Sequence, residues 1–253
     1  MISAGLDSGS ATTKAVLLKD GKCIAYSIQP TAFDFISAAE KAYKDVLDQA
    51  GIVKSDIDHV YSTGYGRNSI KFADKAISEI TAHALGVYHL YPEVNGIIDI
   101  GGQDSKVVSV YNGKVVDFLM NDKCAAGTGK FLEYTARALE VPIDDLGSLA
   151  LASEKPACIT SMCTVFAESE VISLRSRGSA KEDIAAGLIE SIARRIAVMA
   201  LQLGIKQNVA FVGGVAKNTG IRAALEKELQ VSFYVPPEPQ ITGALGAALY
   251  GIG

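Results

Sequence analysis

The chain has 253 residues, 49% of them hydrophobic, so it can bury a core as one domain or as two of about a hundred residues each. Its net charge is −4 and its basic residues are scattered, which argues against a nucleic-acid partner, because proteins that bind nucleic acids gather basic side chains in a patch. The apolar runs fall short of the roughly 20 residues that cross a membrane, so a membrane partner is not expected either.

The cysteines of the chain are Cys23, Cys124, Cys158 and Cys163. The first residues lack the pattern of a signal peptide, so the expected compartment is the cytoplasm. Free, metal-binding or redox thiols are favoured there over disulfides. Cys23 is expected to be buried in a strand, whereas Cys158 could be structural, a spare thiol or an extra metal ligand.

The N-terminal residues predict strands at Ile2–Leu6, Ala15–Leu18 and Cys23–Ile28. Between the first two lies a polar loop, Asp7-Ser-Gly-Ser-Ala-Thr-Thr-Lys14. Small and hydroxyl residues in such a loop let backbone N–H groups approach a phosphate, and an acid at the strand end can hold Mg²⁺. An ordinary hydroxyl-rich hairpin is the alternative interpretation.

Helices and a glycine-rich turn are predicted next. Phe35–Gly51 has one apolar face and ends in glycine, as an amphipathic helix does. His59–Arg67 is predicted to be a strand that runs into a glycine-rich turn. Glu79–Leu90 is a second predicted helix, on which His83 and His89 do not share a face; both are expected to be surface or packing residues.

The opening pattern recurs about 90 residues later, which indicates an internal duplication. Within Gly96–Val110 an apolar strand ends at Asp99, a Gly-Gly turn follows, and a second strand leads to Asn112-Gly113, a strong hairpin signal. One glycine loop is weak support for a phosphate site. Two loops in equivalent places are much stronger support.

The last part of the chain predicts a third nucleotide-binding element. Asn208–Gly220 is predicted to be a buried strand with a Gly-Gly turn, which lets the backbone lie against an adenosine and its phosphate. A long helix, Lys181–Leu203, precedes it and a helix, Ile221–Leu229, follows it. Val231–Val235 is a predicted short strand, and Thr242–Tyr250 a predicted closing helix rich in small residues.

Cys124 and Cys163 each come just before the predicted first turn of a helix. A helix N-terminus presents free N–H groups and the positive end of the helix dipole, which lowers the pKa of a thiol and favours an anion. Two thiolates are half of what a [4Fe–4S] cluster requires, and a symmetric dimer would supply the other half.

Four motifs together resemble the superfamily of sugar kinases, heat-shock chaperones and actin. They are Asp7-Ser-Gly-Ser with Lys14, Asp99-Ile-Gly-Gly-Gln-Asp104, Gly213-Gly-Val-Ala216 and Thr242-Gly-Ala-Leu-Gly246. Two more motifs narrow the resemblance to the ATP-dependent activators of 2-hydroxyacyl-CoA dehydratases and the related ATPase subunits of benzoyl-CoA reductase. These are Asn121-Asp-Lys-Cys-Ala-Ala-Gly-Thr-Gly-Lys130 and Cys163-Thr-Val-Phe-Ala-Glu-Ser-Glu-Val171.

The resemblance implies an α/β fold: a duplicated ribonuclease H-like, or actin-like, ATPase with two lobes around a nucleotide cleft. Lobe I would comprise residues 1–94 with the C-terminal helix 242–253 and would carry the first phosphate loop. Lobe II would comprise residues 95–241 and would carry the second phosphate loop, the cluster cysteines and the adenosine motif.

Roles for individual residues follow from the matching positions. Asp7 and Asp99 would organise Mg²⁺ and the γ-phosphate of ATP, and Gln103 would orient the attacking water. The residues expected to bind the nucleotide are Gly9, Ser10, Thr12, Lys14, Gly101, Gly102, Asp104, Gly213, Gly214 and Ala216. Such a site works by positioning and by neutralising phosphate charge.

The resemblance further implies a homodimer that holds one [4Fe–4S] cluster through Cys124 and Cys163 of both chains. ATP binding and hydrolysis would swing the paired helices. An electron from a ferredoxin or flavodoxin would then pass to a partner iron–sulfur dehydratase or reductase.

Two other functions fit the nucleotide motifs. A small-molecule kinase shares the glycine loops, but no large substrate-binding insertion is present and a kinase would not need the two cysteines. A nucleotide switch without a cluster would use the cysteines only for packing. A zinc site within one chain is poorly supported because no Cys-x-x-Cys pair occurs.

Overall fold

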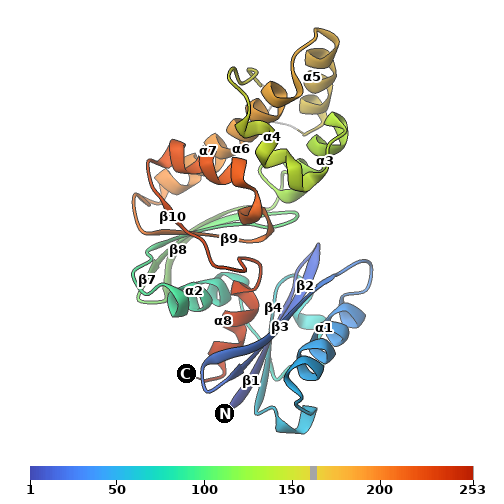
Figure 1. Cartoon of the computed structure of the whole chain (residues 1–253). Helices are drawn as coiled ribbons and strands as arrows, with labels where there is room; N and C mark the ends of the chain where they lie inside the picture. The colour runs from blue at the N-terminus through green and yellow to red at the C-terminus, as the bar shows by residue number, and fades with distance from the viewer. Residues whose placement is uncertain (160–163, 253) are drawn as a thin grey trace. The chain divides into compact units, whose positions relative to one another are not determined.

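The computed structural model of the protein describes residues 1–159 and 164–252, which form two five-stranded sheets and the helices packed on them (Figure 1). The chain divides into two compact units. Unit 1 is made of Met1–Ile97, Val108–Asp117 and Pro236–Gly253, and unit 2 of Ile98–Val107 and Phe118–Val235. The division into lobes at residues 94/95 and 241/242 stays a prediction.

The first sheet belongs to unit 1. Its strands and the helices of this unit are β1 (Ile2–Ser8), β2 (Thr12–Lys19), β3 (Lys22–Pro30), α1 (Phe35–Ala50), β4 (His59–Thr63), β5 (Lys75–Ala76), α2 (Glu79–Leu90) and α8 (Thr242–Tyr250). The strand order is β3-β2-β1-β4-β5. Strand β2 is antiparallel to β1 and β3, whereas β4 is parallel to β1 and β5.

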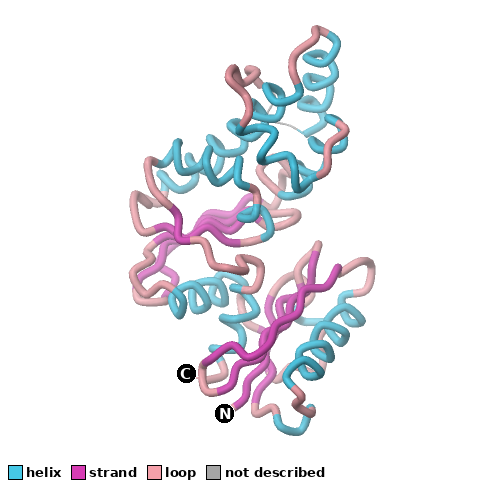
Figure 2. The backbone as a smooth tube through the Cα atoms, in the orientation of Figure 1, coloured by secondary structure: helices cyan, strands magenta, loops and turns pink. Residues whose placement is uncertain are grey.

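Strand β2 is buried on both faces because helices cover both sides of the first sheet. Ala15 and Leu17 belong to the apolar cluster that includes α1, whereas Val16 and Leu18 belong to the cluster that includes α8. Successive side chains of a strand point to opposite faces, so this alternation places α1 and α8 on opposite sides. Figure 2 shows α1 lying along the strands.

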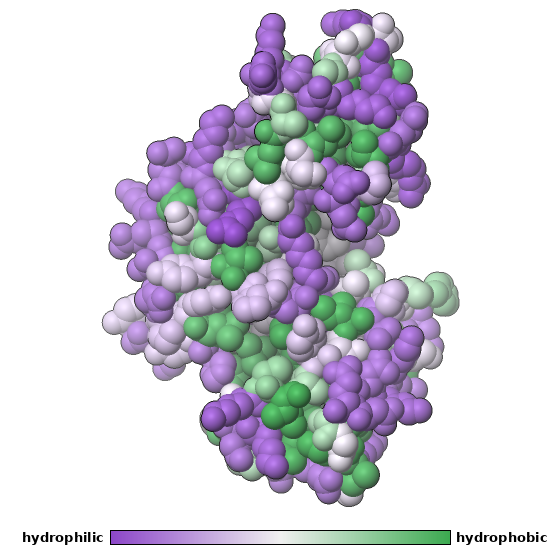
Figure 3. Space-filling view, in the orientation of Figure 1, coloured by the Kyte–Doolittle hydropathy of each residue, from purple (hydrophilic) through white to green (hydrophobic). Residues whose placement is uncertain are grey.

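Helix α1 confirms the amphipathic helix predicted at this position. It begins after Asp34, whose carboxylate accepts hydrogen bonds from the backbone N–H groups of Ile36 and Ser37. It ends at Gly51, whose φ of 63° is left-handed and suits glycine. Its outward side is hydrophilic in the view of Figure 3, as expected for a helix with one buried face.

The second sheet has the order β10-β9-β6-β7-β8. Its strands and the helices of this part of the chain are β6 (Gly96–Ile100), β7 (Ser105–Tyr111), β8 (Lys114–Asn121), α3 (Gly129–Leu139), α4 (Leu146–Leu151), α5 (Thr164–Ser176), α6 (Lys181–Gln202), β9 (Val209–Val212), α7 (Thr219–Leu229) and β10 (Phe233–Tyr234). In unit 2 the core joins Ile98 and Ile100 of β6 and Phe211 of β9 to the buried face of α6.

The two sheets repeat the same strand order. Matching each strand of the first sheet with the fifth strand after it converts β3-β2-β1-β4-β5 into β8-β7-β6-β9-β10. This correspondence agrees with the duplication that the repeated strand–aspartate–glycine pattern predicts. The hairpin predicted at Asn112-Gly113 is also present, with φ values of 48° and 72°.

Two predicted elements differ from the structure. The loop predicted at Asp7–Lys14 is shorter, because the β1–β2 ladder continues to the Ser8–Thr13 pair and places both Asp7 and Lys14 in strands. The strand predicted at Val231–Val235 reaches only from Phe233 to Tyr234. Among the described residues, no helix is long and apolar enough to span a membrane.

Candidate functional site

The first candidate site is built around Asp7 at the end of β1. Asp7 is 3% exposed and pairs with Lys14 on β2, with 3.2 Å between Nζ and Oδ2. Within the described residues, its Oδ1 atom is buried and has no hydrogen-bond partner. A buried carboxylate oxygen without a donor can accept a cation or an ordered water, and the predicted role of Asp7 at Mg²⁺ needs such an atom.

The loop between β1 and β2 is tight and half-exposed. The backbone N–H of Gly9 donates to the carbonyl of Thr12 at 3.2 Å, and the Thr31 hydroxyl donates to the carbonyl of Gly9 at 2.7 Å. The N–H of Gly9, which we expected to bind phosphate, is therefore used within the loop. A Cβ atom at position 9 would lie 3.3 Å from Lys14 Nζ, so glycine keeps the loop open beside this ammonium.

The second candidate site is built around Asp99 at the end of β6 and lies within unit 2. Lys106 on β7 is buried and contacts two carboxylates, Asp99 Oδ2 at 3.4 Å and Asp104 Oδ2 at 2.8 Å. The structure thus brings together two predicted residues, Asp99 and Asp104, through a lysine that the sequence analysis missed. The signal was available, because Lys106 follows Asp99 at the same seven-residue spacing as Lys14 follows Asp7.

The turn after Asp99 is bonded to the start of α3. The carbonyl of Gly101 accepts a hydrogen bond from the N–H of Gly129 at 2.9 Å, and the carbonyl of Gly102 accepts one from Lys130 at 2.8 Å. Backbone hydrogen bonds therefore connect the predicted phosphate loop to the start of α3, the helix that follows the Cys124 segment. Gln103, the predicted water-orienting residue, is exposed at the tip of this turn.

A glycine with positive φ lies against each of the two aspartates. After β9, Gly213 has a φ of 86°, and a Cβ atom there would clash with Asp99 Oδ1. After β4, Gly64 has a φ of 87°, and a Cβ atom there would lie 2.5 Å from Asp7 Oδ1. Gly213 was predicted to line the adenosine, but in the structure it also borders the carboxylate. Gly64 was missed, although it follows the strand that corresponds to β9.

The other residues of the predicted adenosine motif directly follow Gly213. Gly214 begins a short 3₁₀ helix, Gly214–Lys217, which is separated from α7 by the extended residue Asn218. Ala216 within it is buried, as is Val215. The backbone of this turn is therefore held by packing in unit 2.

Cys124 lies in the loop between β8 and α3 and is half-buried, with its thiol free. The side-chain amide of Asn121 donates to the carbonyls of Cys124 and Ala126 at 2.9 and 3.0 Å, and the Thr128 hydroxyl donates to the carbonyl of Ala125 at 2.7 Å. These bonds hold the loop around Cys124. A free and partly accessible thiol at this place can serve as a metal ligand.

The other three cysteines lie in three different parts of the chain. Cys163 lies outside the described residues, and α5 begins at the next residue, Thr164. Cys158 is exposed and free. Cys23 is exposed as well, so the expectation that it is buried in a strand is wrong: β3 is the edge strand of the first sheet, with several exposed side chains.

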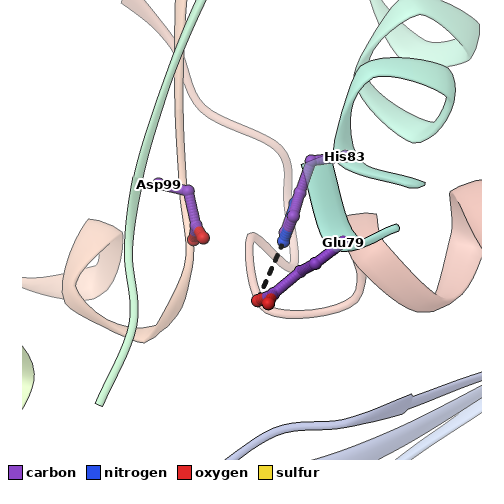
Figure 4. Close-up of side chains that lie close together, drawn as sticks. All are labelled: Glu79, His83 and Asp99. Atoms are coloured by element: carbon purple, nitrogen blue, oxygen red, sulfur yellow. Dashed lines mark ion pairs between the residues drawn. The ribbon is translucent and has the colours of Figure 1, made fainter. Parts of the chain in front are cut away.

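His83 is a further buried group that the sequence analysis left among surface or packing residues. Its Nδ1 atom lies 2.9 Å from the Thr242 hydroxyl, and its Nε2 atom lies 4.0 Å from Glu79 on the same helix. Figure 4 shows the His83 and Glu79 side chains turned toward each other from α2. His89, by contrast, is exposed, as expected.

Comparison with known proteins gives close matches along nearly the whole chain. Residues 4–251 match the model of the BadF/BadG/BcrA/BcrD ATPase family. The (R)-2-hydroxyglutaryl-CoA dehydratase activating ATPase of Acidaminococcus fermentans is 47% identical, over 97% of this chain and 95% of the relative.

Two solved structures are also close. Component A of the (R)-2-hydroxyglutaryl-CoA dehydratase of Acidaminococcus fermentans has a TM-score of 0.96 and 46% identity, covering 99% of this chain and 97% of that one. The activator of the 2-hydroxyisocaproyl-CoA dehydratase from Clostridium difficile, with bound ADPNP, has a TM-score of 0.93 and 45% identity, covering 99% and 94%.

More distant structures share the fold alone. A ROK family glucokinase from Streptomyces griseus is 14% identical with a TM-score of 0.61, covering 99% of both chains. Together with the two matching sheets, these likenesses confirm the α/β fold class predicted from the sequence, a duplicated actin-like ATPase fold.

Proposed function

Because the chain belongs to the BadF/BadG/BcrA/BcrD ATPase family, we propose that it is an ATP-hydrolysing activator of a 2-hydroxyacyl-CoA dehydratase. The observation that carries this proposal is the likeness, over nearly the whole chain, to dehydratase activators, one of which binds ADPNP. The two aspartate–lysine sites, one in each unit, support the ATPase part.

In ATP hydrolysis, Asp7 and Asp99 would hold hydrated Mg²⁺ and orient the γ-phosphate. The ammonium groups of Lys14 and Lys106, each beside its aspartate, would neutralise phosphate charge, and Gln103 would orient the attacking water. The protein contributes little covalent chemistry to phosphoryl transfer, so positioning and electrostatic stabilisation carry the rate.

The glycine turns would bind the rest of the nucleotide. Gly213, Gly214 and Ala216 would line the adenosine, because a glycine turn lets the backbone approach a flat ring. The remaining residues proposed to bind the nucleotide are Ser10, Thr12, Gly101, Gly102 and Asp104, with Gly9 contributing space rather than its N–H group.

Cys124 and Cys163 are the residues that would hold a [4Fe–4S] cluster, with two thiolates from each chain of a homodimer. The free, half-buried thiol of Cys124 fits this role, and one chain cannot supply the four thiolates through these two residues. Such a cluster, when bound, supplies a one-electron carrier. The proposed partners are a ferredoxin or flavodoxin as electron source and an iron–sulfur dehydratase or reductase as acceptor.

The proposal is tested by metal and ATPase measurements on protein purified without oxygen. We expect roughly four irons and four sulfides per dimer, their loss in air, and ATP hydrolysis by the reduced protein. Cys124→Ala should lose the iron and the visible absorbance of the cluster. Cys23→Ala is the matched control, because Cys23 is also a free thiol, and it should keep both.

Two results would count against the proposal separately. Protein that stays free of iron after reconstitution but hydrolyses ATP would contradict the cluster and favour a nucleotide switch or a kinase. Protein that binds iron through Cys124 but does not hydrolyse ATP would contradict the ATPase.

A further inference from the structure

The imidazole of His83 lies where α2, the first turn of α8 and Asp7 meet, all within unit 1. His83 is 4% exposed, and Thr242, its hydrogen-bond partner at the start of α8, is completely buried. A Cβ atom at Gly243 would lie 3.2 Å from Asp7 Oδ2 and 3.3 Å from His83 Nε2. The residue after Thr242 therefore borders both the carboxylate and the imidazole.

The Thr242 hydroxyl joins His83 to the residues just before α8. It lies 2.9 Å from His83 Nδ1, and which of these two atoms donates depends on the tautomer of the ring. The same hydroxyl lies 3.4 Å from the carbonyl of Pro239, which can only accept. The other ring nitrogen, Nε2, faces the Glu79 carboxylate at 4.0 Å (Figure 4).

The first turn of α8 controls the surroundings of the Asp7 carboxylate. Gly243 has no side chain, and any side chain there would crowd both Asp7 and His83. A shift of this turn by a few tenths of an ångström would therefore either press on the carboxylate or open space beside it.

We propose that His83 is a positioning residue for Asp7. Through its hydrogen bond to Thr242, the imidazole fixes the first turn of α8, and thereby Gly243, against the Asp7 carboxylate. This inference rests on the proposed ATPase function, because that function gives Asp7 its role at Mg²⁺ and the γ-phosphate. His83 acts through Thr242 and Gly243, so its loss should slow turnover more than it weakens ATP binding.

The test compares amide substitutions that mimic one ring nitrogen each. The side-chain amide of His83→Asn places a hydrogen-bonding group near the position of Nδ1, whereas that of His83→Gln reaches the position of Nε2. His83→Ala supplies neither. His89→Ala is the matched control, because His89 is an exposed histidine on the same helix. Steady-state ATP hydrolysis and nucleotide affinity are measured on the full chain with its cofactors.

We expect His83→Ala and His83→Gln to lower kcat by about tenfold or more, since small misplacements of catalytic groups have effects of this size. The KM for ATP should change by less than about threefold, because Asp7 matters most in the transition state. His83→Asn and His89→Ala should stay close to the wild-type kcat. If His83 were needed only for packing, His83→Gln, which is closer to histidine in size, would be at least as active as His83→Asn.

Thr242→Val gives a second route, because valine keeps the shape of threonine and removes the hydroxyl group that His83 contacts. It should lower kcat as His83→Ala does, and the double variant should be no slower than either single variant, since both remove the same bond. Thermal unfolding establishes whether each variant is folded. If His83→Ala does not fold, the comparison of His83→Asn, His83→Gln and Thr242→Val still decides the outcome.

The inference is overturned if His83→Asn is as slow as His83→Gln, or if the effects of His83→Ala and Thr242→Val on kcat multiply. An active wild type whose His83 variants match His89→Ala overturns this inference alone. A wild type without ATP hydrolysis overturns the proposed function and this inference together.

Discussion

The two positive-φ glycines, Gly64 and Gly213, decide how closely the backbone approaches the aspartates of the candidate sites. Gly64 follows β4, which is parallel to the strand of Asp7, and Gly213 follows β9, which lies beside the strand of Asp99. At both positions a Cβ atom would clash with Oδ1 of the aspartate. A side chain at either position would meet a steric clash in addition to the unfavourable left-handed backbone. The same requirement recurs in both units, once for Asp7 and once for Asp99.

We predict that Gly64→Ala and Gly213→Ala each lower ATP hydrolysis by about tenfold or more, because the new methyl group must displace the adjacent carboxylate. Gly178→Ala is the matched control: its φ of 80° is similar, but nothing lies within 4 Å of its Cβ position. The control should lose about 1 kcal/mol of stability for the backbone strain alone, with normal turnover. Denaturant unfolding and ATPase assays check both quantities.

Equal losses of turnover in Gly64→Ala and Gly178→Ala would show that backbone strain, rather than crowding of Asp7, causes the effect. The same comparison applies to Gly213→Ala and Asp99.

At the scale of elements, the start of α3 is tied to the turn after Asp99. The N–H groups of Gly129 and Lys130 would have no partner inside the helix, and the carbonyls of Gly101 and Gly102 accept them instead. A nucleotide bound at this turn would therefore restrain the start of α3 as well. Cys124 lies in the loop that leads into this helix.

We predict that Mg²⁺ with ADPNP slows the alkylation of Cys124 in cluster-free protein by about threefold or more, because ordering the turn reduces local opening of the loop. Gly129→Pro should abolish this protection: proline suits the first position of a helix but has no N–H for the Gly101 carbonyl. Gly129→Ala keeps the N–H and should keep the protection. Mass spectrometry reports the rates, with Cys23 as the internal reference.

Full protection in Gly129→Pro would mean that the backbone bond to Gly101 does not carry the effect. An alkylation rate of Cys23 that falls in parallel would point to a change of the whole chain instead.

Elements were more predictable from the sequence than the residues that complete the sites. Periodic apolar spacing and a terminal glycine predicted α1, and the long helix α6 was predicted to within one residue of its observed end. The predicted length of the loop before Lys14 was wrong, because pairing between β1 and β2 extends the ladder over polar residues, and this pairing depends on the partner strand. Lys106 and Gly64 were predictable by comparing the two halves. His83 was not, since its role depends on Thr242, far away in the chain.

At the scale of the whole molecule, the two duplicated halves share their strand order but differ in the ion pairs at their candidate sites. Among the described residues, Lys14 pairs with the carboxylate of Asp7, whereas Lys106 is more deeply buried and contacts both Asp99 and Asp104. Removing one partner of a buried ion pair leaves uncompensated charge and costs about 3–5 kcal/mol. The two lysines should therefore contribute differently to stability, although they occupy equivalent strands.

We predict that Lys106→Met lowers the free energy of unfolding by about 3–5 kcal/mol and that Lys14→Met lowers it by less, because Lys14 is less deeply buried beside Asp7 than Lys106 is beside Asp99 and Asp104. Asp104→Asn should restore part of the loss in the Lys106→Met background, since it removes one of the two charges. Lys227→Met is the control: Lys227 is 73% exposed in its pair with Glu190, so about 0–1 kcal/mol is expected. Denaturant unfolding measures all four variants.

Equal unfolding free energies for Lys106→Met and Lys227→Met would contradict this view of the second site. Failure of Asp104→Asn to restore stability would assign the loss to packing of the lysine stem rather than to charge.

The position of α8 in the chain has a consequence for synthesis. Val16 and Leu18 of β2 are covered by a helix that the ribosome makes after every other element of unit 1. At bacterial or eukaryotic rates of elongation, one face of the first sheet stays bare on the order of ten seconds after its strands have emerged. A nascent chain at this stage presents an apolar surface to chaperones and proteases. Chains that stop before Thr242 would keep that surface, so quality control can distinguish unfinished copies from finished ones.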